Sequence, residues 1–327
     1  MDDERPVLTV TLNPALDVTH EVDGVRWSEV NRPAGAWARP GGKGLNVART
    51  LHALGCPVVA TGMLGGWTGR AVLSGLEQAG VAAQFAQIDG ETRRTFVVLD
   101  TRAGQTASFY EEGPSVGVPE FAAFLATYQS LLTRCAAVVL SGSLPPGLAP
   151  DAYGQLVSLA SAAGVGSVLD ADGEPLRRGA LAGPEIAKPN LTELESWSGQ
   201  GLRDGNGVAD LSAVVAAAAG LRRSGPHSVV TSLGAGGLVA TTAAGVWLAR
   251  APEPVAGNPT GAGDAVAAAL ALSLAGRLAD PGWPQALRHA AALGAATVAS
   301  RVAGEFSAEV YQQALAEIVV TGPQGER

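Results

Sequence analysis

One stretch near the C-terminal end of the chain reads Asn258-Pro259-Thr260-Gly261-Ala262-Gly263-Asp264 and runs directly into Ala265–Ala275. Its first half predicts a turn, because Pro259 lacks a backbone donor and two glycines permit φ values that other residues avoid. Its second half is almost entirely Ala, Val and Leu, which predicts a helix that is apolar on every face and therefore buried. The stretch thus predicts a tight turn that opens a buried helix, with one carboxylate, Asp264, at the junction.

The carboxylate at this junction has two interpretations. A glycine-rich turn that opens a helix presents unpaired N–H groups and the positive end of the helix dipole, which suits a phosphate. An Asp there would repel that phosphate unless it has a task of its own, such as accepting the proton of a hydroxyl that attacks a phosphoryl group. The alternative is an Asp that only caps a buried helix.

Strand and helix patterns alternate along the rest of the chain, beginning with the apolar run Val7–Leu12. Further strands are expected at Val58–Met63, Val81–Ile88, Ala136–Leu140, Ser167–Asp170, Ile186–Lys188, Ser228–Ser232, Leu238–Thr241 and Val246–Arg250. Helices are expected at Leu45–Leu54, Gly69–Ala79, between Val116 and Arg134, and at Asp151–Ala163, Leu191–Trp197, Val208–Arg222, Trp283–Ser300 and Ala308–Val319. The alternation predicts an α/β fold with a mostly parallel sheet covered on both faces. Strand-rich segments at about 18–39 and 91–112 are expected to form a smaller sheet, and no linker divides residues 1–327.

Composition limits the classes of function. The chain has 327 residues, 47% of them hydrophobic, a net charge of −8 and only two cysteines. The scattered basic residues make nucleic acid and anionic membranes poor partners, and Cys56 and Cys135 lack the spacing of a zinc site. The acidic start of the sequence and the short apolar runs lead us to expect a cytoplasmic protein without a signal peptide or a membrane span.

A second glycine-rich loop, Pro40-Gly41-Gly42-Lys43-Gly44, precedes a predicted helix. It is not a Walker A loop, because Gly44 follows the lysine and Trp37 stands where that motif needs its first glycine. No GxGxxG follows the first strand, which weighs against a dinucleotide-binding oxidoreductase. A tight turn with a solvated lysine is the alternative to a binding loop.

Two more clusters lie at predicted strand ends. Lys188-Pro189-Asn190 with Glu193 offers an amide oxygen and a carboxylate that could hold Mg²⁺ through water, or an N-cap with its capping-box Glu. The second cluster is Ser232-Leu233-Gly234-Ala235-Gly236-Gly237. Its small residues could let a flat base approach the backbone, or the segment could be only a hairpin. The four histidines are dispersed, so zinc and hydrolase sites are not favoured.

Together these motifs resemble the ribokinase-like sugar kinases of the phosphofructokinase-B type over essentially the whole chain. The loop Gly41–Ala48, with Gly55 and Gly65 at the family spacing, resembles the N-terminal signature, and Asn258–Ala271 resembles the C-terminal one. Three segments resemble the hexose-phosphate branch, which contains 1-phosphofructokinase, tagatose-6-phosphate kinase and the minor 6-phosphofructokinase: Thr11–Asp17, Val30–Arg32 and Ser141–Gly147. The resemblance implies a three-layer α/β/α sandwich with a small β-sheet lid.

The resemblance also implies roles for individual residues. Asp264 is expected to be the base, with the amides of Gly261, Ala262 and Gly263 as an anion hole. The implied substrate-binding residues are Asp17, Gly42, Lys43, Asn46, Arg93 and Ser141. The implied ATP-binding residues are Lys188, Asn190, Glu193, Ser232, Gly234 and Gly237, with Asn190 and Glu193 also serving Mg²⁺.

Within this set, Lys43 and Arg93 are expected to bind the phosphate already on the sugar, since arginine suits bidentate contact. The adjacent Arg94 leaves open which arginine faces the ligand. Asp170 and Asp172 follow a predicted strand and can be assigned no more than a position near the site.

The expected activity is ATP-dependent phosphorylation of a ketohexose phosphate, first D-fructose 1-phosphate to fructose 1,6-bisphosphate. Tagatose 6-phosphate, fructose 6-phosphate, a nucleoside or a non-catalytic sugar-phosphate sensor remain alternatives, because fold alone does not choose among them. A homodimer through the small sheet is expected, since its exposed edges could be covered by a partner sheet.

Overall fold

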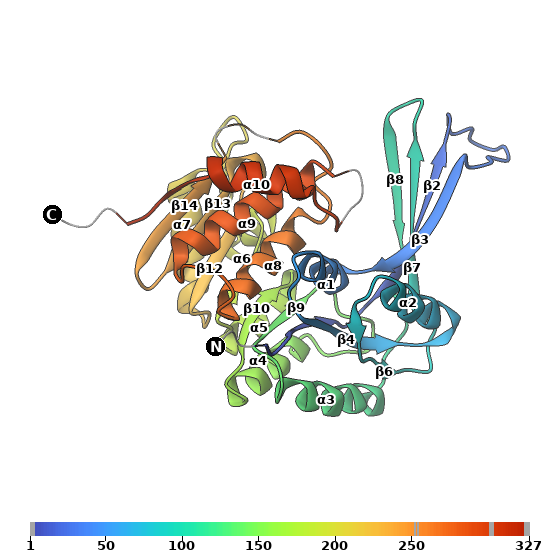
Figure 1. Ribbon diagram of the computed structural model, residues 1–327, viewed down its shortest axis with the longest axis horizontal. Coiled ribbons are helices and arrows are strands. Elements are labelled where there is room, and N and C mark those ends of the chain that lie inside the picture. Colours follow the sequence, from blue (N-terminus) through green and yellow to red (C-terminus); the bar gives the residue numbers. More distant parts are fainter. Residues whose placement is uncertain (1–3, 252, 254, 301–303, 324–327) are drawn as a thin grey trace.

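The computed structural model describes residues 4–251, 253, 255–300 and 304–323. Its main feature is an 11-stranded sheet with the order β15-β14-β13-β12-β11-β10-β9-β1-β4-β5, in which β6 also pairs with β4 (Figure 1). The pairs from β5 to β12 are parallel and the last three are antiparallel, so the predicted mostly parallel α/β sheet is confirmed. Its strands are β1 Val7–Thr11, β4 Val58–Leu64, β5 Ala82–Ala83, β6 Ala86–Gln87, β9 Ala137–Ser141, β10 Gly166–Asp170, β11 Ile186–Ala187, β12 Ser228–Ser232, β13 Leu238–Thr242, β14 Gly245–Arg250 and β15 Val319–Thr321.

Helices cover both faces of this sheet. Alternation along the strands explains why: Val7 and Val139 belong to the hydrophobic core on one face, and Leu8 and Leu140 to the core on the other. The first face carries α1 Lys43–Ala53, α2 Gly66–Gln78, α8 Ala262–Leu274, α9 Trp283–Val298 and α10 Ala308–Glu317. The second carries α3 Val118–Leu132, α4 Ala152–Ala162, α5 Gly173–Leu181, α6 Leu191–Ser198 and α7 Leu211–Arg223.

Helix α8 lies at the centre of the first face. Every residue from Asp264 to Leu272 is buried, as the uniformly apolar sequence predicts. Its small alanines let α1 and α9 pack against it, and it also contacts β9 and β10. The turn at Gly261 is therefore fixed close to the carboxyl ends of the central strands, where α/β folds bind ligands.

A small four-stranded sheet, which we call the small sheet, projects from the body (Figure 1). Its order is β3-β2-β7-β8, with bounds β2 Ala15–Val22, β3 Gly35–Gly41, β7 Arg93–Asp100 and β8 Gln105–Tyr110. Asp17 pairs with Arg39 on one side and with Thr95 on the other. Because side chains alternate along a strand, Arg93 and Thr95 share the face of Asp17, whereas Arg94 points to the opposite face.

Some elements differ from the prediction. Residues 173–181 form α5, which the sequence conceals because Pro175 and Gly179 are helix-breaking types. Gly179 is needed there, since a Cβ on it would come within 2.8 Å of Leu169 Cδ2. The expected strand over 81–88 is reduced to the two short strands β5 and β6, and β15 follows α10 where the helix was expected to continue. No helix in the described part of the chain is long and apolar enough to cross a bilayer.

Candidate active site

A cleft of about 1130 Å³ lies where the small sheet meets the carboxyl ends of the central strands. Each glycine-rich loop leads into a helix whose N-terminus lies at this cleft. Gly42 is the N-cap of α1 with φ 108°, and Gly261 is the N-cap of α8 with φ 89°, so both positions use a left-handed backbone that favours glycine. The cleft therefore receives two helix N-termini from opposite ends of the sequence.

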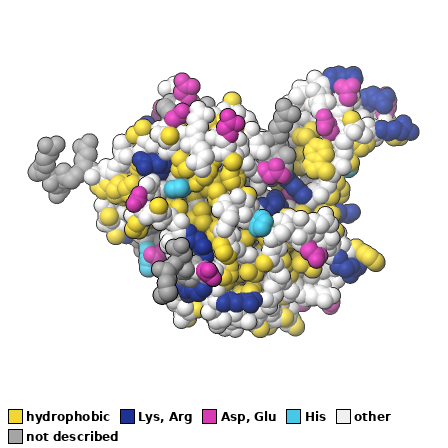
Figure 2. Space-filling model, in the orientation of Figure 1, with side chains coloured by type: hydrophobic (Ala, Val, Ile, Leu, Met, Phe, Trp, Pro, Cys, Tyr) yellow, Lys and Arg dark blue, Asp and Glu magenta, His cyan; other side chains and the backbone are white. Residues whose placement is uncertain are grey.

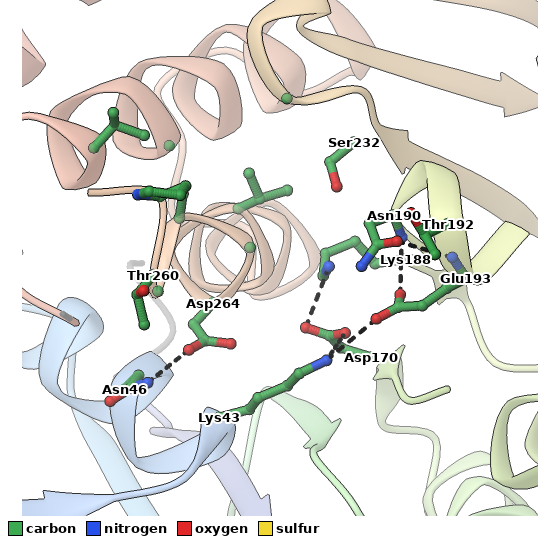
Figure 3. Close-up of a pocket in the computed structure, with 18 of the residues that line it drawn as sticks. Lys43, Asn46, Asp170, Lys188, Asn190, Thr192, Glu193, Ser232, Thr260 and Asp264 are labelled. Atoms are coloured by element: carbon green, nitrogen blue, oxygen red, sulfur yellow. Dashed lines mark hydrogen bonds and ion pairs between the residues drawn. The ribbon is translucent and has the colours of Figure 1, made fainter. Parts of the chain in front are cut away.

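Asp264 lies in the first turn of α8 and is buried. Its Oδ2 accepts a hydrogen bond of 2.7 Å from Asn46 Nδ2 on α1 (Figure 3). The N-cap of α8 is Gly261, and the hydrogen bond that the described residues give the Asp264 carboxylate comes from the Asn46 side chain rather than from a backbone amide of the turn. Burial, and next the charge of Asp170, raise the pKa of Asp264 to about 6, against the opposing effects of Asn46, Lys43 and Lys188. A carboxylate with this pKa can accept a proton near neutral pH.

Asp170, at the end of β10, has the opposite environment. Its Oδ1 lies 3.0 Å from Lys43 Nζ and its Oδ2 lies 3.2 Å from Lys188 Nζ (Figure 3). Burial opposes ionisation of Asp170, but Lys188 and Lys43 outweigh it and hold its pKa below the usual range. The same contact raises the pKa of Lys43, so its ammonium stays charged beside the ionised Asp170 at neutral pH.

The structure places Lys43 in the cleft and beside acidic side chains. Its ammonium faces Asp170 and lies 3.6 Å from Glu193 Oε1, among the residues expected to serve ATP. That Lys43 binds the phosphate already on the sugar stays a prediction. Its neighbours are set by tertiary structure, because α1 begins opposite the carboxyl end of β10 and the first turn of α6, which no sequence spacing reveals.

The turn before α8 corrects the expectation for the amide of Ala262. The amide of Ala262 donates to Pro259 O at 3.1 Å and is engaged within the turn, so it is not free for an anion hole. The amides of Gly261 and Gly263 find no backbone acceptor among the described residues. A Cβ on Gly263 would lie 3.5 Å from Lys188 Nζ, so this lysine and the helix N-terminus face the same space. Together they suit a phosphoryl group.

Asn190 and Glu193 form a reciprocal capping box at the start of α6. Asn190 Oδ1 accepts from the Glu193 amide and Glu193 Oε2 accepts from the Asn190 amide, both at 2.9 Å. This is the structural alternative that the sequence left open. No group of three His, Cys, Asp or Glu residues that could hold a metal occurs within the described ranges. A metal here would need the nucleotide and water as further ligands.

The side of the cleft that is expected to take the nucleotide is lined largely by small and apolar residues. Ser232, Gly234 and Gly237 line it as expected, around the 3₁₀ turn Gly234–Gly236. The sequence did not identify the rest of this wall, which comes from the segment before α8, from α9 and from the end of α10: Val255, Ala256, Ala295, Val298 and Ile318. Small apolar side chains give no motif, so only the packing of α9 and α10 reveals them.

The opposite end of the cleft is formed by the small sheet. Asp17 accepts a hydrogen bond from Thr95 Oγ1 at 2.5 Å. Arg93 lines the cleft and donates from Nε to Asn13 O and from Nη1 to Glu111 O, both at 3.1 Å. Arg94 instead bonds Glu111 and lies over the Phe96 ring, on the other face of β7. Because side chains alternate along β7, Arg93 and not Arg94 is on the face that lines the cleft.

Three other residues complete this end. Arg39 lines the cleft from β3, and the sequence reasoning did not identify it. Ser141, expected to bind substrate, is fully buried at the end of β9, whereas the next two residues, Gly142 and Ser143, line the cleft. The strand continues one residue further than expected, which carries Ser141 into the core.

Comparison with known proteins agrees with this geometry. Residues 11–309 match the model of the pfkB family carbohydrate kinases. The chain belongs to this family. Family membership makes it an ATP-dependent sugar kinase, as the resemblance implied.

Solved structures of similar proteins cover nearly the whole chain. Phosphofructokinase-2 from Escherichia coli, in complex with potassium, is 27% identical over 95% of this chain and 98% of its own, with a TM-score of 0.87. A possible 1-phosphofructokinase from Thermotoga maritima is 27% identical over 97% and 99%, with a TM-score of 0.83. Ribokinase from Arabidopsis thaliana is 20% identical over 95% and 98%, with a TM-score of 0.73, which shows the fold alone.

Proposed function

We propose that this kinase transfers the γ-phosphoryl group of ATP to a ketohexose phosphate, with D-fructose 1-phosphate as the first candidate and fructose 1,6-bisphosphate as its product. The observation that carries the proposal is the guanidinium of Arg93, held by two backbone carbonyls on the cleft face of the small sheet. An arginine fixed in this way can contact a phosphate with little further loss of conformational entropy. The names of the two 27% identical structures support the same substrate class.

The chemistry follows from Asp264. Its Oδ2 is engaged by Asn46, so Oδ1 is the oxygen available to the acceptor hydroxyl. As that hydroxyl attacks the γ-phosphorus, Asp264 takes its proton and the bond to the β-phosphate oxygen breaks. Lys188 and the Gly263 amide face the transferring group and stabilise its charge. Lys43, beside Asp170, serves the same phosphates in this proposal.

Mg²⁺ supplies charge neutralisation of the ATP phosphates in this class of reaction. Asn190 and Glu193 would hold it through water. Glu193 Oε1 is the oxygen available for this role, because the capping box uses Oε2.

We also propose that the whole chain acts as one unit, with the small sheet as a lid over the acceptor end, and that two copies pair through this lid in the cytoplasm. Figure 2 shows hydrophobic side chains exposed on the small sheet below a charged tip. The exposed set includes Trp37, Phe109 and Tyr110. A second small sheet could cover them and the strand edges.

A coupled ADP-release assay tests the activity across fructose 1-phosphate, fructose 6-phosphate, tagatose 6-phosphate, unphosphorylated sugars and nucleosides. We expect the highest kcat/KM with fructose 1-phosphate. A preference for another ketohexose phosphate would change the acceptor and keep the class. Turnover of only free sugars or nucleosides would overturn the proposal, and binding of a sugar phosphate without turnover would indicate a sensor.

A further inference from the structure

Arg49 lies one helical turn after Asn46 on α1 and bonds to two parts of the molecule. Its Nη2 donates to Asn46 Oδ1 at 2.5 Å, and its Nη1 donates to the carbonyl of Pro40 at the end of β3. Asn46 in turn donates to Asp264. A continuous hydrogen-bonded chain thus runs from a strand of the small sheet, through Arg49 and Asn46, to the carboxylate of Asp264.

This chain fixes the orientation of the Asn46 amide. A guanidinium has only donors, so the amide must turn its oxygen toward Arg49 and its NH₂ toward Asp264. The opposite orientation would set NH₂ against a guanidinium donor and a carbonyl oxygen against a carboxylate. Packing adds to this, because a Cβ on Gly304 would lie 2.8 Å from Asn46 Oδ1 and 2.9 Å from Arg49 Nη2. Gly304 therefore packs directly against the contact between Asn46 and Arg49, where a side chain would not fit.

We propose that Arg49 is a positioning residue for the base: it holds the Asn46 amide so that Nδ2 donates to Asp264 Oδ2, which leaves Oδ1 for the acceptor hydroxyl. The inference rests on the proposed function for its kinetic readout. It also couples the base to the small sheet, since Arg49 is anchored on Pro40 of β3. A shift of β3 over a bound acceptor would thereby be transmitted to Asn46 and Asp264.

Arg49 also affects the pKa of Asp264. The charged groups that face Asp264 are Asp170, Lys43 and Lys188, and Arg49 interacts with it as well. Around Arg49 itself lie Arg39, Asp17 and Glu305. Donation from Asn46 and the positive charge of Arg49 both favour the ionised carboxylate. Loss of Arg49 therefore raises the pKa of Asp264, and the acid limb of the pH profile moves to higher pH.

The experiment compares Arg49→Met with the wild type in kcat/KM against pH. We expect the acid limb to move up by about one pH unit, the lower end of the range for loss of a neighbouring opposite charge or hydrogen bond. Such a shift costs about eightfold at pH 5.5 and almost nothing at pH 8. Arg49→Lys keeps the charge and one donor and should give a smaller shift. Arg70→Met removes an exposed arginine that lies over Trp67 on α2, and should leave the limb in place.

The same substitution made in an Asn46→Ala variant separates the effect of the Arg49 charge from its effect on the orientation of the Asn46 amide. In Asn46→Ala the amide is absent, so adding Arg49→Met should move the limb less than it does in the wild type. Equal shifts in both backgrounds would mean that Arg49 acts through its charge alone, and would overturn the positioning role. A uniform loss of activity at every pH would also overturn it, since that is the pattern of a purely structural defect.

A readout without turnover keeps the inference separate from the proposed function. Carbon-13 NMR of the aspartate carboxyls, with the Asp264 signal assigned by Asp264→Asn, should show a higher pKa for Asp264 in Arg49→Met. An unchanged pKa in that variant and in Arg49→Lys overturns the inference whatever the enzyme does. If the wild type phosphorylates no sugar, the proposed function fails and the carboxyl titration still decides the role of Arg49.

Discussion

The cleft contains two buried aspartates in two regions of the molecule, at the end of β10 and in the first turn of α8. Asp170 is 1% exposed and Asp264 is 6% exposed, so burial disfavours ionisation of both. Asp170 lies between two lysines and its pKa is lowered, whereas Asp264 accepts a hydrogen bond from an amide, and burial with the charge of Asp170 raises its pKa to about 6. The two pKa values differ because of the lysines beside Asp170 and not because of a difference in burial.

This difference assigns two tasks within one cleft. A carboxylate that two cations keep ionised has no proton to exchange at neutral pH, but it can hold both lysines in place in the cleft. A carboxylate without a directly paired cation can exchange a proton near neutral pH. The four predictions below test this contrast between the Asp170 region and the Asp264 region.

The largest expected effect is on turnover in Asp264→Asn. This substitution keeps the shape and removes the proposed base, so kcat should fall by roughly 10²–10⁴, while ATP affinity and the circular dichroism spectrum are retained. Asp210→Asn is the matched control, because Asp210 is a true N-cap of α7 that accepts from the Ser212 amide. Near-normal turnover in Asp264→Asn would remove Asp264 as the base.

Next in size is the stability of Asp170→Asn. Loss of this carboxylate leaves Lys188, which is 3% exposed, without its buried counter-charge. Breaking a buried pair in this way costs about 3–5 kcal/mol of the free energy of unfolding, measured by urea denaturation. Glu174→Gln breaks the exposed pair with Arg178 and should cost less than about 1 kcal/mol. Equal losses in the two variants would show that Asp170 is not an anchor.

The third prediction compares cations of the two regions. Arg93→Met should lower kcat/KM for the sugar phosphate by about one to two decades, because a charge-assisted contact contributes on the order of 1.5–3 kcal/mol. The KM for ATP should change little. Lys43→Met, in the Asp170 region, should instead weaken steps that involve ATP. Arg94→Met, one residue along and on the opposite face of β7, is the control and should stay within about twofold of wild type. Loss of the same size on free and phosphorylated sugars would show that Arg93 does not read a phosphate.

The smallest effect concerns pH and stability at Asp264. Its pKa is about 6 in the folded protein and ~3.9 when unfolded, so protonation favours the folded state. That contribution is fully present below pH ~4 and is lost as pH rises through about 6. Asp264→Asn should therefore be more stable than wild type at pH 7.5, by up to about 3 kcal/mol, and the difference should shrink at pH 4.5. A variant less stable than wild type at pH 7.5 would contradict the raised pKa.

Several features of the site could be predicted from the sequence because they depend on local chemistry. Glycines at the starts of α1 and α8 are required by backbone angles, and the apolar run after Asp264 predicts a buried helix. The choice of Arg93 over Arg94 was not available from the sequence alone. Strand parity with Asp17 and Thr95 settles it, once the register of β2 and β7 is known.

Other features could not be predicted because they join residues far apart in the chain. The bond between Asn46 and Asp264 spans 218 positions, and that between Lys43 and Asp170 spans 127. Two more such features are the position of Lys43 beside Asp170 and Glu193 and the exclusion of Ser141 from the cleft, which follow from the packing of α1 and the length of β9. Arg49 gave no signal in the sequence, since its role appears only when Pro40 and Asn46 are seen around it.

By itself the sequence determined the alternation of strands and helices, the two glycine turns and the presence of one carboxylate at the start of a buried helix. These follow from backbone geometry and hydrophobic periodicity, which act over a few residues. Only the tertiary structure decided which aspartate is paired and which is left to exchange a proton. That choice depends on the distances from each carboxylate to lysines brought in from other elements, and electrostatic interactions respond to distance in space rather than along the chain.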